Sequence, residues 1–204
     1  MRIGIDIRSI GKRGTGDEVY TTQLIRNLAR SGEEHMFVLF TDDEEIPTYE
    51  LIQHLPANMQ VVVIPPAHRA VWMFVRLPRY ARAYNLDLLH VQYITPLYIR
   101  DMTLITTIHD VSWKVLPASV PFKDRLLLNM CMPKSVRSAD HVLTVSHHSK
   151  EQIERLYPAS HGKVTTIYNG GYIDPADRSL AADIDPVSNR AKTYLSYCGR
   201  TRRS

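Results

Sequence analysis

Cysteine and long apolar runs are both scarce in this chain of 204 residues. The two cysteines, Cys131 and Cys198, are too few and too far apart for a disulfide framework or a structural zinc site. No apolar run approaches the roughly 18–20 residues that span a bilayer. Asp6 and Arg8 interrupt the N-terminal stretch in which a signal peptide would have its apolar core. These absences lead us to expect a reduced, cytoplasmic protein.

Strong charge bias and low-complexity sequence are missing as well. The 25 basic and 21 acidic residues give a formal net charge of +4, and 44% of the residues are hydrophobic, which is too many for a disordered chain. The basic residues are mostly scattered, so nucleic-acid binding is not expected. The mild basic excess permits an anionic ligand or an anionic membrane surface. One full domain of ordinary size fits this length.

Short apolar segments alternate with segments of helical periodicity along most of the chain. Most of the apolar segments are continuous, as expected for strands of a parallel sheet that helices cover on both faces. The alternation predicts an α/β fold with a doubly wound parallel sheet. The predicted strands are residues 3–7, 36–41, 60–64, 86–91, 103–108, 141–145 and 163–167. The predicted helices are residues 17–30, 48–54, 71–84, 121–138 and 149–156, and the first is predicted to bury Val19, Thr22, Leu24, Ile25 and Leu28.

The sequence changes character after Asn169. Residues 173–192 carry prolines, acidic and amide side chains and little apolar periodicity, which is typical of a linker. Residues 193–198 then resemble a new buried strand, and one strand cannot bury itself. We therefore expect one domain over residues 1–172, a linker over 173–192 and, over 193–204, the first strand of a truncated second domain.

A glycine-containing loop, residues 11–16, lies between the first predicted strand and the first predicted helix. Ligands of doubly wound sheets bind outside the carboxyl ends of the strands, so this loop borders the expected cleft. The third glycine of a dinucleotide fingerprint is absent, and no Gly-Lys-Ser/Thr of a P-loop follows. Asp17 and Glu18 at the helix start would repel a phosphate and would suit hydroxyl groups. The alternative is a plain tight turn.

Two polar pairs follow later predicted strands. His109 and Asp110 come after the fifth strand, where the imidazole is a candidate to orient a sugar or carbonyl and the carboxylate to accept hydrogen bonds from hydroxyls. Alternatively, Asp110 caps the next turn. Ser146 and Ser149 come after the sixth strand and are predicted mainly to cap the following helix, with ligand contact as the alternative. The adjacent histidines between them lack a third ligand, so no metal site is predicted.

The segment 69–84 carries arginines near helical spacing beside Trp72 and Phe74. It is predicted to be a covering helix with a solvated basic side, which Pro78 shortens. The alternative is peripheral contact with an anionic membrane, at the inner face of the cell membrane. Because no Ser-His-Asp, Cys-His or paired-carboxylate spacing stands out, the sequence gives no support for nucleophilic catalysis.

Seven segments occur in an order that resembles the N-terminal domain of glycosyltransferase family 4, also called the group 1 glycosyltransferases. They are RIGIDIR, GTGDEVYTTQLIRNL, LDLLHVQYITPL, TTIHD, ADHVLTVSHHSKEQI, KVTTIYNGGYID and YLSYCGR, and together they extend from Met1 to about Arg200. The resemblance implies a GT-B architecture, in which two Rossmann-like domains face each other across a cleft. This chain would be the N-terminal, acceptor-side half.

The resemblance also implies roles for single residues. Gly14 and Gly16 would line the cleft near the donor phosphate and sugar. His109 would lie beside the transferred sugar and position it. Ser146 and Ser149 would line the wall of the cleft.

Two further positions match the family near the C-terminal end of the resemblance. Arg200 matches the arginine that meets the donor diphosphate, and the chain ends before the next family lysine and the paired glutamates that hold the donor. Asn169 matches the start of the family's Asn-Gly-Val-Asp, as a substrate-binding candidate. This sequence reads Asn-Gly-Gly-Tyr-Ile-Asp there, with two extra residues.

The resemblance therefore implies the acceptor-binding half of a retaining, metal-independent, hexosyltransferase-like glycosyltransferase. Such an enzyme moves a sugar from a nucleotide-sugar to a glycan, lipid or metabolite hydroxyl. No cofactor is expected, and the isolated chain is predicted to be inactive. The alternatives are a stand-alone glycan- or lipid-binding module, or a subunit whose donor domain is a separate chain. In a third alternative, a nucleotide-cofactor protein, Asp42 or Asp43 would meet a ribose hydroxyl.

Overall fold

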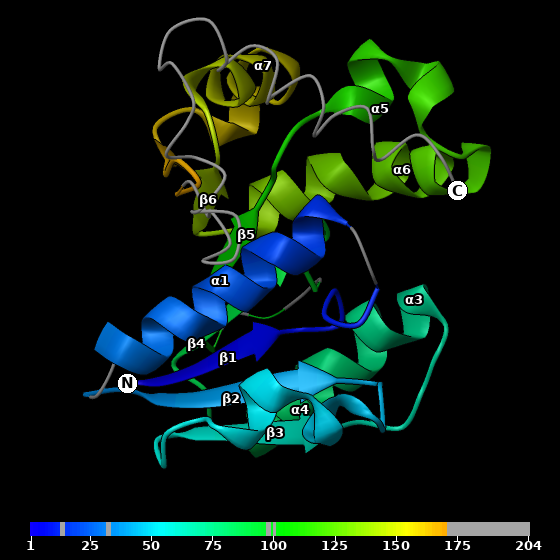
Figure 1. The fold of residues 1–204 in the computed structure, drawn as a ribbon. Helices are drawn as coiled ribbons and strands as arrows, with labels where there is room; N and C mark the ends of the chain where they lie inside the picture. The colour runs from blue at the N-terminus through cyan, green and yellow to red at the C-terminus, as the bar shows by residue number, and fades with distance from the viewer. Residues whose placement is uncertain (13–14, 32–33, 97–98, 100, 171–204) are drawn as a thin grey trace, which may run out of the picture. The chain divides into compact units, whose positions relative to one another are not determined.

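In the computed structural model, helices separate most successive strands up to β7, and β5 follows β4 without a helix among the described residues (Figure 1). The structure describes residues 1–12, 15–31, 34–96, 99 and 101–170. The strands are β1 (Arg2–Asp6), β2 (Met36–Thr41), β3 (Met59–Val63), β4 (Leu88–Gln92), β5 (Thr103–Thr107), β6 (His141–Thr144) and β7 (Val164–Thr166). The helices are α1 (Gly16–Ser31), α2 (Glu50–Gln53), α3 (Arg69–Val71), α4 (Leu77–Ala83), α5 (Ser112–Val115), α6 (Phe122–Ser138) and α7 (His147–Leu156).

All seven strands form one parallel sheet in the order β3-β2-β1-β4-β5-β6-β7. β1 lies inside the sheet, where Gly4 is paired with Val38 of β2 on one side and Leu89 of β4 on the other. The chain first builds outward from β1 to β3, then returns and builds outward in the other direction. This is the order of a doubly wound, Rossmann-like sheet, so the predicted α/β fold class is confirmed.

Helices cover the two faces of the sheet and give each face its own core. On one face, Ile25 of α1 and Ile52 of α2 pack with the side chains of β1 and β2. On the other face, Trp72, Leu128 and Ile153 bring the segment 69–83, α6 and α7 into a larger core. Figure 1 shows α1 in front of the sheet and α4 behind it. The continuous apolar strands of the sequence follow from this double cover.

The buried side of α1 differs from the predicted stripe at Val19 and at Thr22, which is only partly buried. Thr21 and Ile25 are buried, and Leu24 and Leu28 pack against the core while partly buried. Val19, however, is 52% exposed, so its predicted burial is wrong. Val19 precedes Thr21 by two residues, which places it roughly 200° around the helix from the buried side.

The segment from α3 to α4 is one covering helix with a π-helical turn inside it. The turn η2 (Trp72–Arg76) joins α3 to α4, and Pro78 follows in the first turn of α4. Trp72, Met73 and Leu77 are buried against the sheet, which confirms the predicted covering role. A wide π turn just before a proline removes the need for the hydrogen bond that proline cannot donate.

The chain divides into a unit of Met1–Tyr168 and a second unit of Asn169–Ser204. The predicted linker at 173–192 and the predicted strand at 193–204 lie outside the described residues. Within the described ranges, no helix is both long and apolar enough to cross a membrane.

Candidate functional site

The candidate site lies at the carboxyl ends of β1, β4 and β5, beside the start of α1. Side chains alternate along β4, and Leu89 and Val91 belong to the core under α4 and α6. His90 and Gln92 therefore face α1. His109, the predicted sugar-positioning residue, follows two positions after the end of β5. The sheet thus places three polar side chains from neighbouring strands at the edge where ligands of this fold class bind.

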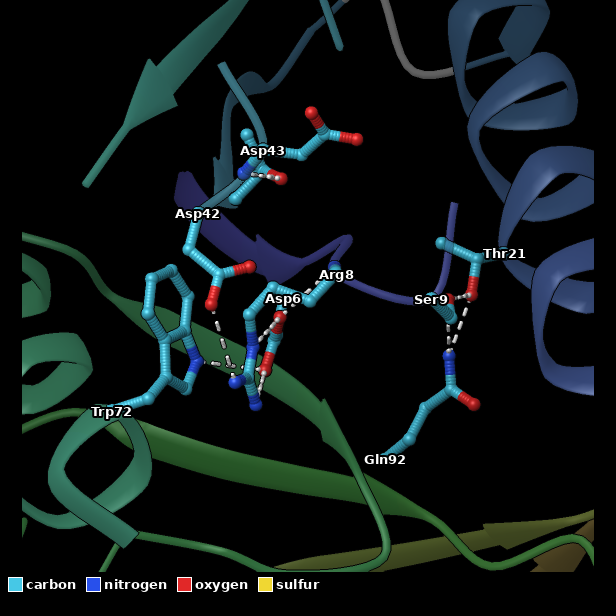
Figure 2. Close-up of polar contacts among 9 residues, drawn as sticks. Asp6, Arg8, Ser9, Thr21, Asp42, Asp43, Trp72 and Gln92 are labelled. Atoms are coloured by element: carbon cyan, nitrogen blue, oxygen red, sulfur yellow. Dashed lines mark hydrogen bonds and ion pairs between the residues drawn. The ribbon is translucent and has the colours of Figure 1, made fainter. Parts of the chain in front are cut away.

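A row of hydrogen bonds fixes the orientation of the Gln92 side chain (Figure 2). Thr21 Oγ1 donates its one proton to the backbone oxygen of Asp17 at 2.8 Å, so towards its other neighbours it is an acceptor. These neighbours are Gln92 Nε2 at 2.5 Å and the Ser9 hydroxyl at 2.7 Å. With its nitrogen held there, Gln92 directs Oε1 to His109 Nε2, 3.1 Å away. His109 Nε2 therefore carries the ring proton and donates it to Gln92.

The other ring nitrogen of His109, Nδ1, is left as an acceptor. Within the part of the chain that the structure describes, Nδ1 has no hydrogen bond. The Asp17 carboxylate lies 3.6 Å from Nε2, and the rings of Tyr20 and Tyr93 lie at 4.7 and 5.7 Å between centroids. Burial lowers the pKa of His109, against the opposing effect of the carboxylates of Asp17 and Asp110. The imidazole is consequently neutral at physiological pH.

Tyr93, which follows β4, adopts a left-handed backbone conformation with φ of 60°. A bulky residue in this region stores strain and is a genuine outlier. The Tyr93 ring lies between His109 and Trp113, with centroids 5.7 and 5.9 Å away. Burial, together with the carboxylates of Asp17 and Asp110, raises the pKa of its phenol, which stays protonated. Tyr93 therefore forms an aromatic wall beside the imidazole.

The glycine loop is held by the first turn of α1. Gly11 has a φ of +90°, which strains any L side chain, and a Cβ there would also lie 2.8 Å from the Tyr49 hydroxyl, so glycine is strongly favoured. The Gly11 N–H donates to Glu18 Oε1 at 2.9 Å. Gly16 begins α1 and borders open space, since a Cβ there would meet no atom within 4 Å. Gly14, the second glycine predicted in the site, lies outside the described residues.

Asp110 and Ser146 have capping roles that the sequence offers, whereas Ser149 lies inside α7 and is not its cap. Asp110 Oδ1 accepts the Ser112 N–H at 2.8 Å, which caps the turn before α5. Ser146 caps α7, because its Oγ accepts the Ser149 N–H at 3.0 Å and donates to Ser149 Oγ at 2.9 Å. Ser149 itself is buried. The pair stands after β6, one strand beyond β5, so the structure groups His109 with Asp17 and Gln92 rather than with the serines.

Two remaining predicted site residues lie past the first unit. Asn169 is exposed and belongs to the second unit, which begins there. Arg200, the candidate for the donor diphosphate, lies outside the described residues. Their roles stay predictions.

A buried charged cluster next to the site was missed by the sequence reasoning (Figure 2). Asp6 Oδ2 accepts from Trp72 Nε1 at 3.1 Å, and Asp6 Oδ1 is 3.3 Å from Arg8 Nε. The Arg8 guanidinium lies over the Trp72 ring at 4.3 Å and is 3.8 Å from Asp42. The cluster ties the end of β1 to the π turn of the opposite helix. Its signal is present in RIGIDIR, where Asp6 and Arg8 alternate inside an apolar strand.

A second missed group lies one layer deeper, below the row that holds His109. His90 Nε2 is 2.8 Å from Thr107 Oγ1, and Tyr20 OH is 3.1 Å from the same oxygen. Burial lowers the pKa of His90 to about 4, with a smaller contribution from His109 in the same direction. Burial also raises the pKa of Tyr20. Both side chains are therefore neutral and support the layer above them.

No cluster of three or more histidine, cysteine or acidic side chains that could hold a metal ion occurs among the described residues. A hollow of about 1490 Å³ lies at the opposite edge of the sheet, where Asp87, Thr103 and Asp140 stand beside the starts of β4, β5 and β6. Ligands of doubly wound sheets bind at the carboxyl ends of the strands, so this hollow is not the candidate site.

Comparison with known proteins gives a family match and a fold match. The model of Glycosyltransferase Family 4 matches residues 14–174. The crystal structure of a glycosyltransferase from Rickettsia africae ESF-5 is similar, with 13% identity and a TM-score of 0.51, over 96% of this chain and 49% of that one. The apo form of the lipopolysaccharide outer core galactosyltransferase WaaB is similar with 14% identity and a TM-score of 0.48, over 86% of this chain and 47% of that one. No curated protein sequence matches the chain.

The likeness to the Rickettsia structure shows the fold. It is the fold that we predicted, a Rossmann-like sheet that makes up one half of a GT-B architecture. The chain spans about half the length of the two solved structures that it matches.

Proposed function

The chain belongs to glycosyltransferase family 4, and we propose that it forms the acceptor-binding half of a retaining transferase. The reaction moves a hexose from a nucleotide-sugar to a hydroxyl of a glycan, lipid or metabolite. Family membership supports the class of reaction. The side chains at the carboxyl edge of the sheet support the acceptor-binding role.

The observation that carries this proposal is the row Ser9, Thr21, Gln92 and His109 beside Asp17. Hydroxyl, amide, neutral imidazole and carboxylate groups are the partners that sugar hydroxyls need, since each hydroxyl both donates and accepts. In this proposal, His109 Nδ1 and the Asp17 carboxylate accept hydrogen bonds from sugar hydroxyls. The Tyr93 ring offers an apolar wall for a sugar face.

The donor diphosphate is bound mainly outside this row in our proposal. Asp17 and Glu18 occupy the first turn of α1, where a phosphate would otherwise meet free N–H groups. Glu18 also takes the N–H of Gly11. Gly16 borders open space near the donor sugar, and Arg200 is the proposed cationic partner of the diphosphate.

The chemical step then needs no base from this row. His109 is neutral and holds the sugar through Nδ1, while Gln92 fixes the ring through Nε2. As the bond to the donor sugar breaks, the departing phosphate oxygen takes the proton of the acceptor hydroxyl. Attack from the side of the leaving group retains the configuration at the sugar carbon. The residues described here position groups, and the leaving group supplies the basicity.

The test uses the purified 204-residue chain, a panel of soluble mono- and disaccharide glycosides, and UDP-, GDP- and ADP-sugars. We expect at least one glycoside to bind without nucleotide in ligand-observed NMR. Gln92→Leu weakens that binding about tenfold, because it frees the His109 ring and removes the three hydrogen bonds of the Gln92 side chain. Arg26→Leu, on the exposed side of α1, is the matched control and leaves binding unchanged.

Two results would count against the proposal. Tight binding of a nucleotide-sugar with no glycoside binding would move the site from acceptor to donor. Transfer or hydrolysis of a nucleotide-sugar by the isolated chain would overturn its predicted inactivity.

The nucleotide-cofactor alternative has less support from the geometry. Asp42 is 3.8 Å from Arg8, and the Asp43 carboxylate accepts the Glu45 N–H at 2.9 Å, so both candidate ribose ligands already have partners. We expect NAD and NADP to leave the melting temperature unchanged, and an upward shift would revive this alternative.

A further inference from the structure

An exposed apolar stripe runs along the outer side of α6. Phe122, Leu126 and Met130 recur every fourth residue and therefore lie on one side of the helix. Their exposed fractions are 67%, 49% and 66%. Val115 and Leu116, just before α6 in the chain, are also exposed. These five side chains are called here the α6 surface. They are nearly half of the large hydrophobic residues that are exposed in the described part of the chain.

The same helix is apolar on its inner side. Leu128, Met132 and Val136 of α6 are buried in the core under the sheet. α6 therefore carries apolar side chains on its outer side as well as on its inner side. Among the described residues, the Arg125 guanidinium lies over the Phe122 ring at 5.4 Å and donates a hydrogen bond to the Pro117 backbone oxygen. About half or more of each side chain in the outer stripe is nevertheless exposed. A cluster of exposed apolar side chains of this kind marks an interaction surface.

The segment that contains the α6 surface, residues 112–138, has a net positive charge. Residues 112–138 contain five basic residues and one acidic residue, which gives +4, equal to the formal net charge of all 204 residues. The single acidic side chain, Asp124, is 3.6 Å from Arg69 of α3. Lys123 and Lys134 are exposed. The only carboxylate of this segment is therefore paired with an arginine, so an anionic partner would not be repelled by an unpaired negative charge there.

We infer that the α6 surface binds an anionic lipid bilayer. The apolar side chains enter the boundary between headgroups and acyl chains, and the surrounding lysines contact lipid phosphates. A second copy of this chain is a poor occupant, because a two-fold contact would bring together two copies of segment 112–138, each with a net charge of +4.

The α6 surface is not the segment 69–84, for which the sequence offered membrane contact as an alternative. Of the four arginines in 69–84, Arg69 and Arg82 are in ion pairs with carboxylates and Arg76 is hydrogen-bonded to backbone carbonyls. Val71 and Val75 are exposed there, but the cationic groups are mostly occupied. The inference concerns lipid binding alone and does not rest on sugar transfer.

Vesicle sedimentation tests the inference with the 204-residue chain. Vesicles of phosphatidylcholine alone are compared with vesicles that also contain phosphatidylglycerol. We expect binding to the anionic vesicles only, weakened by added salt. The triple variant Phe122→Ser, Leu126→Ser, Met130→Ser lowers the partition coefficient about tenfold or more.

A double variant that reverses the charge of two lysines tests the electrostatic part of lipid binding separately from the apolar part. Lys123→Glu with Lys134→Glu also lowers binding about tenfold or more. Its matched control, Arg26→Glu with Arg30→Glu on the exposed side of α1, changes the net charge equally and retains most of the binding. Circular dichroism and the melting temperature confirm that each variant is folded.

Three results would overturn the inference. They are absence of binding to either vesicle, equal binding to both vesicles, and equal binding by the wild type and the α6 variants. A dimer in analytical ultracentrifugation that the triple variant abolishes would assign the stripe to a second copy and would also overturn it.

Discussion

Side chains from three strand ends and one helix decide which nitrogen of His109 carries its proton. Thr21 and Gln92, which are 71 residues apart in the chain, share a hydrogen bond that turns the Gln92 oxygen toward the imidazole. The sequence places His109 correctly after a strand. It cannot give the tautomer, because that depends on contacts made only when β1, β4 and α1 come together.

Gln92→Glu tests this dependence directly. A carboxylate next to Nε2 favours the imidazolium, so the pKa of His109 rises by about one unit or more. An NMR titration of the histidine ring protons measures the change. Gln53→Glu, an exposed position on α2, is the control. An unchanged His109 titration in Gln92→Glu would contradict the assigned hydrogen bond.

Gly11 and Gly16 provide a matched pair within one loop. Gly11→Ala places a Cβ 2.8 Å from the Tyr49 hydroxyl at a φ of +90°, so we expect a loss of about 1–3 kcal/mol in the free energy of unfolding. Gly16→Ala meets no atom within 4 Å and changes stability by about 0.5 kcal/mol or less. Urea denaturation of both variants measures the difference. Equal losses would show that the loop has another conformation.

His90 makes the stability of the chain depend on pH. Its pKa is about 4 in the folded chain against an ordinary value of 6.5, so the unfolded chain takes up the proton first as the pH falls. The contribution of neutral His90 to the free energy of unfolding is complete above the ordinary pKa of 6.5. It is lost as the pH falls from that value to the folded-state pKa of about 4. We expect a loss of about 2 kcal/mol from neutral pH to about pH 5.

His90→Gln, which keeps a hydrogen-bonding group toward Thr107, removes most of this slope. Urea denaturation at a series of pH values compares the two proteins. A variant with the same slope as the wild type would show that other groups cause it.

Polar residues inside apolar strands were the weakest point of the sequence reasoning. Asp6, Arg8 and Gln92 are visible in the sequence, but their partners Trp72 and Thr21 come from other elements. Spacing along one strand tells which side chains share a face. It does not tell which helix will cover that face.

Among the elements, α7 has the best-defined start. The sequence offers two capping arrangements, and the structure selects Ser146, which accepts the Ser149 N–H. Ser146→Ala therefore lowers the free energy of unfolding by about 1 kcal/mol. Ser31→Ala, which removes a hydroxyl that bonds only its own exposed helix turn, costs about 0.5 kcal/mol or less. Thermal unfolding of both variants checks this order, and the reverse order would contradict it.

All predicted strands and helices occur in the structure, with ends within two residues of those predicted. The apolar pattern is strong because both faces of the sheet are covered. The short helix α5 was missed, since four residues before Pro117 are too few for a periodic signal. The π turn was missed for a different reason, because Pro78 indicates a break but not how the chain bridges it.

For the whole molecule, the order of strands follows from simple connection rules. Right-handed crossovers and helices on both faces allow few arrangements of seven parallel strands, and the observed one is among them. The alternation of elements therefore predicts the fold class well. The α6 surface could not be predicted in this way, because the inner and outer sides of α6 are both apolar in the sequence.

The interior position of β1 has a consequence for synthesis on the ribosome. β1 is made before the other six described strands, but its second edge is paired only when residues 88–90 arrive. At roughly 5–20 residues per second, several seconds pass before β4 is available. During that time one edge of β1 exposes unpaired backbone groups to other nascent chains. Among the strands that lie inside the described sheet, β1 therefore waits longest for its second partner while the protein is being made.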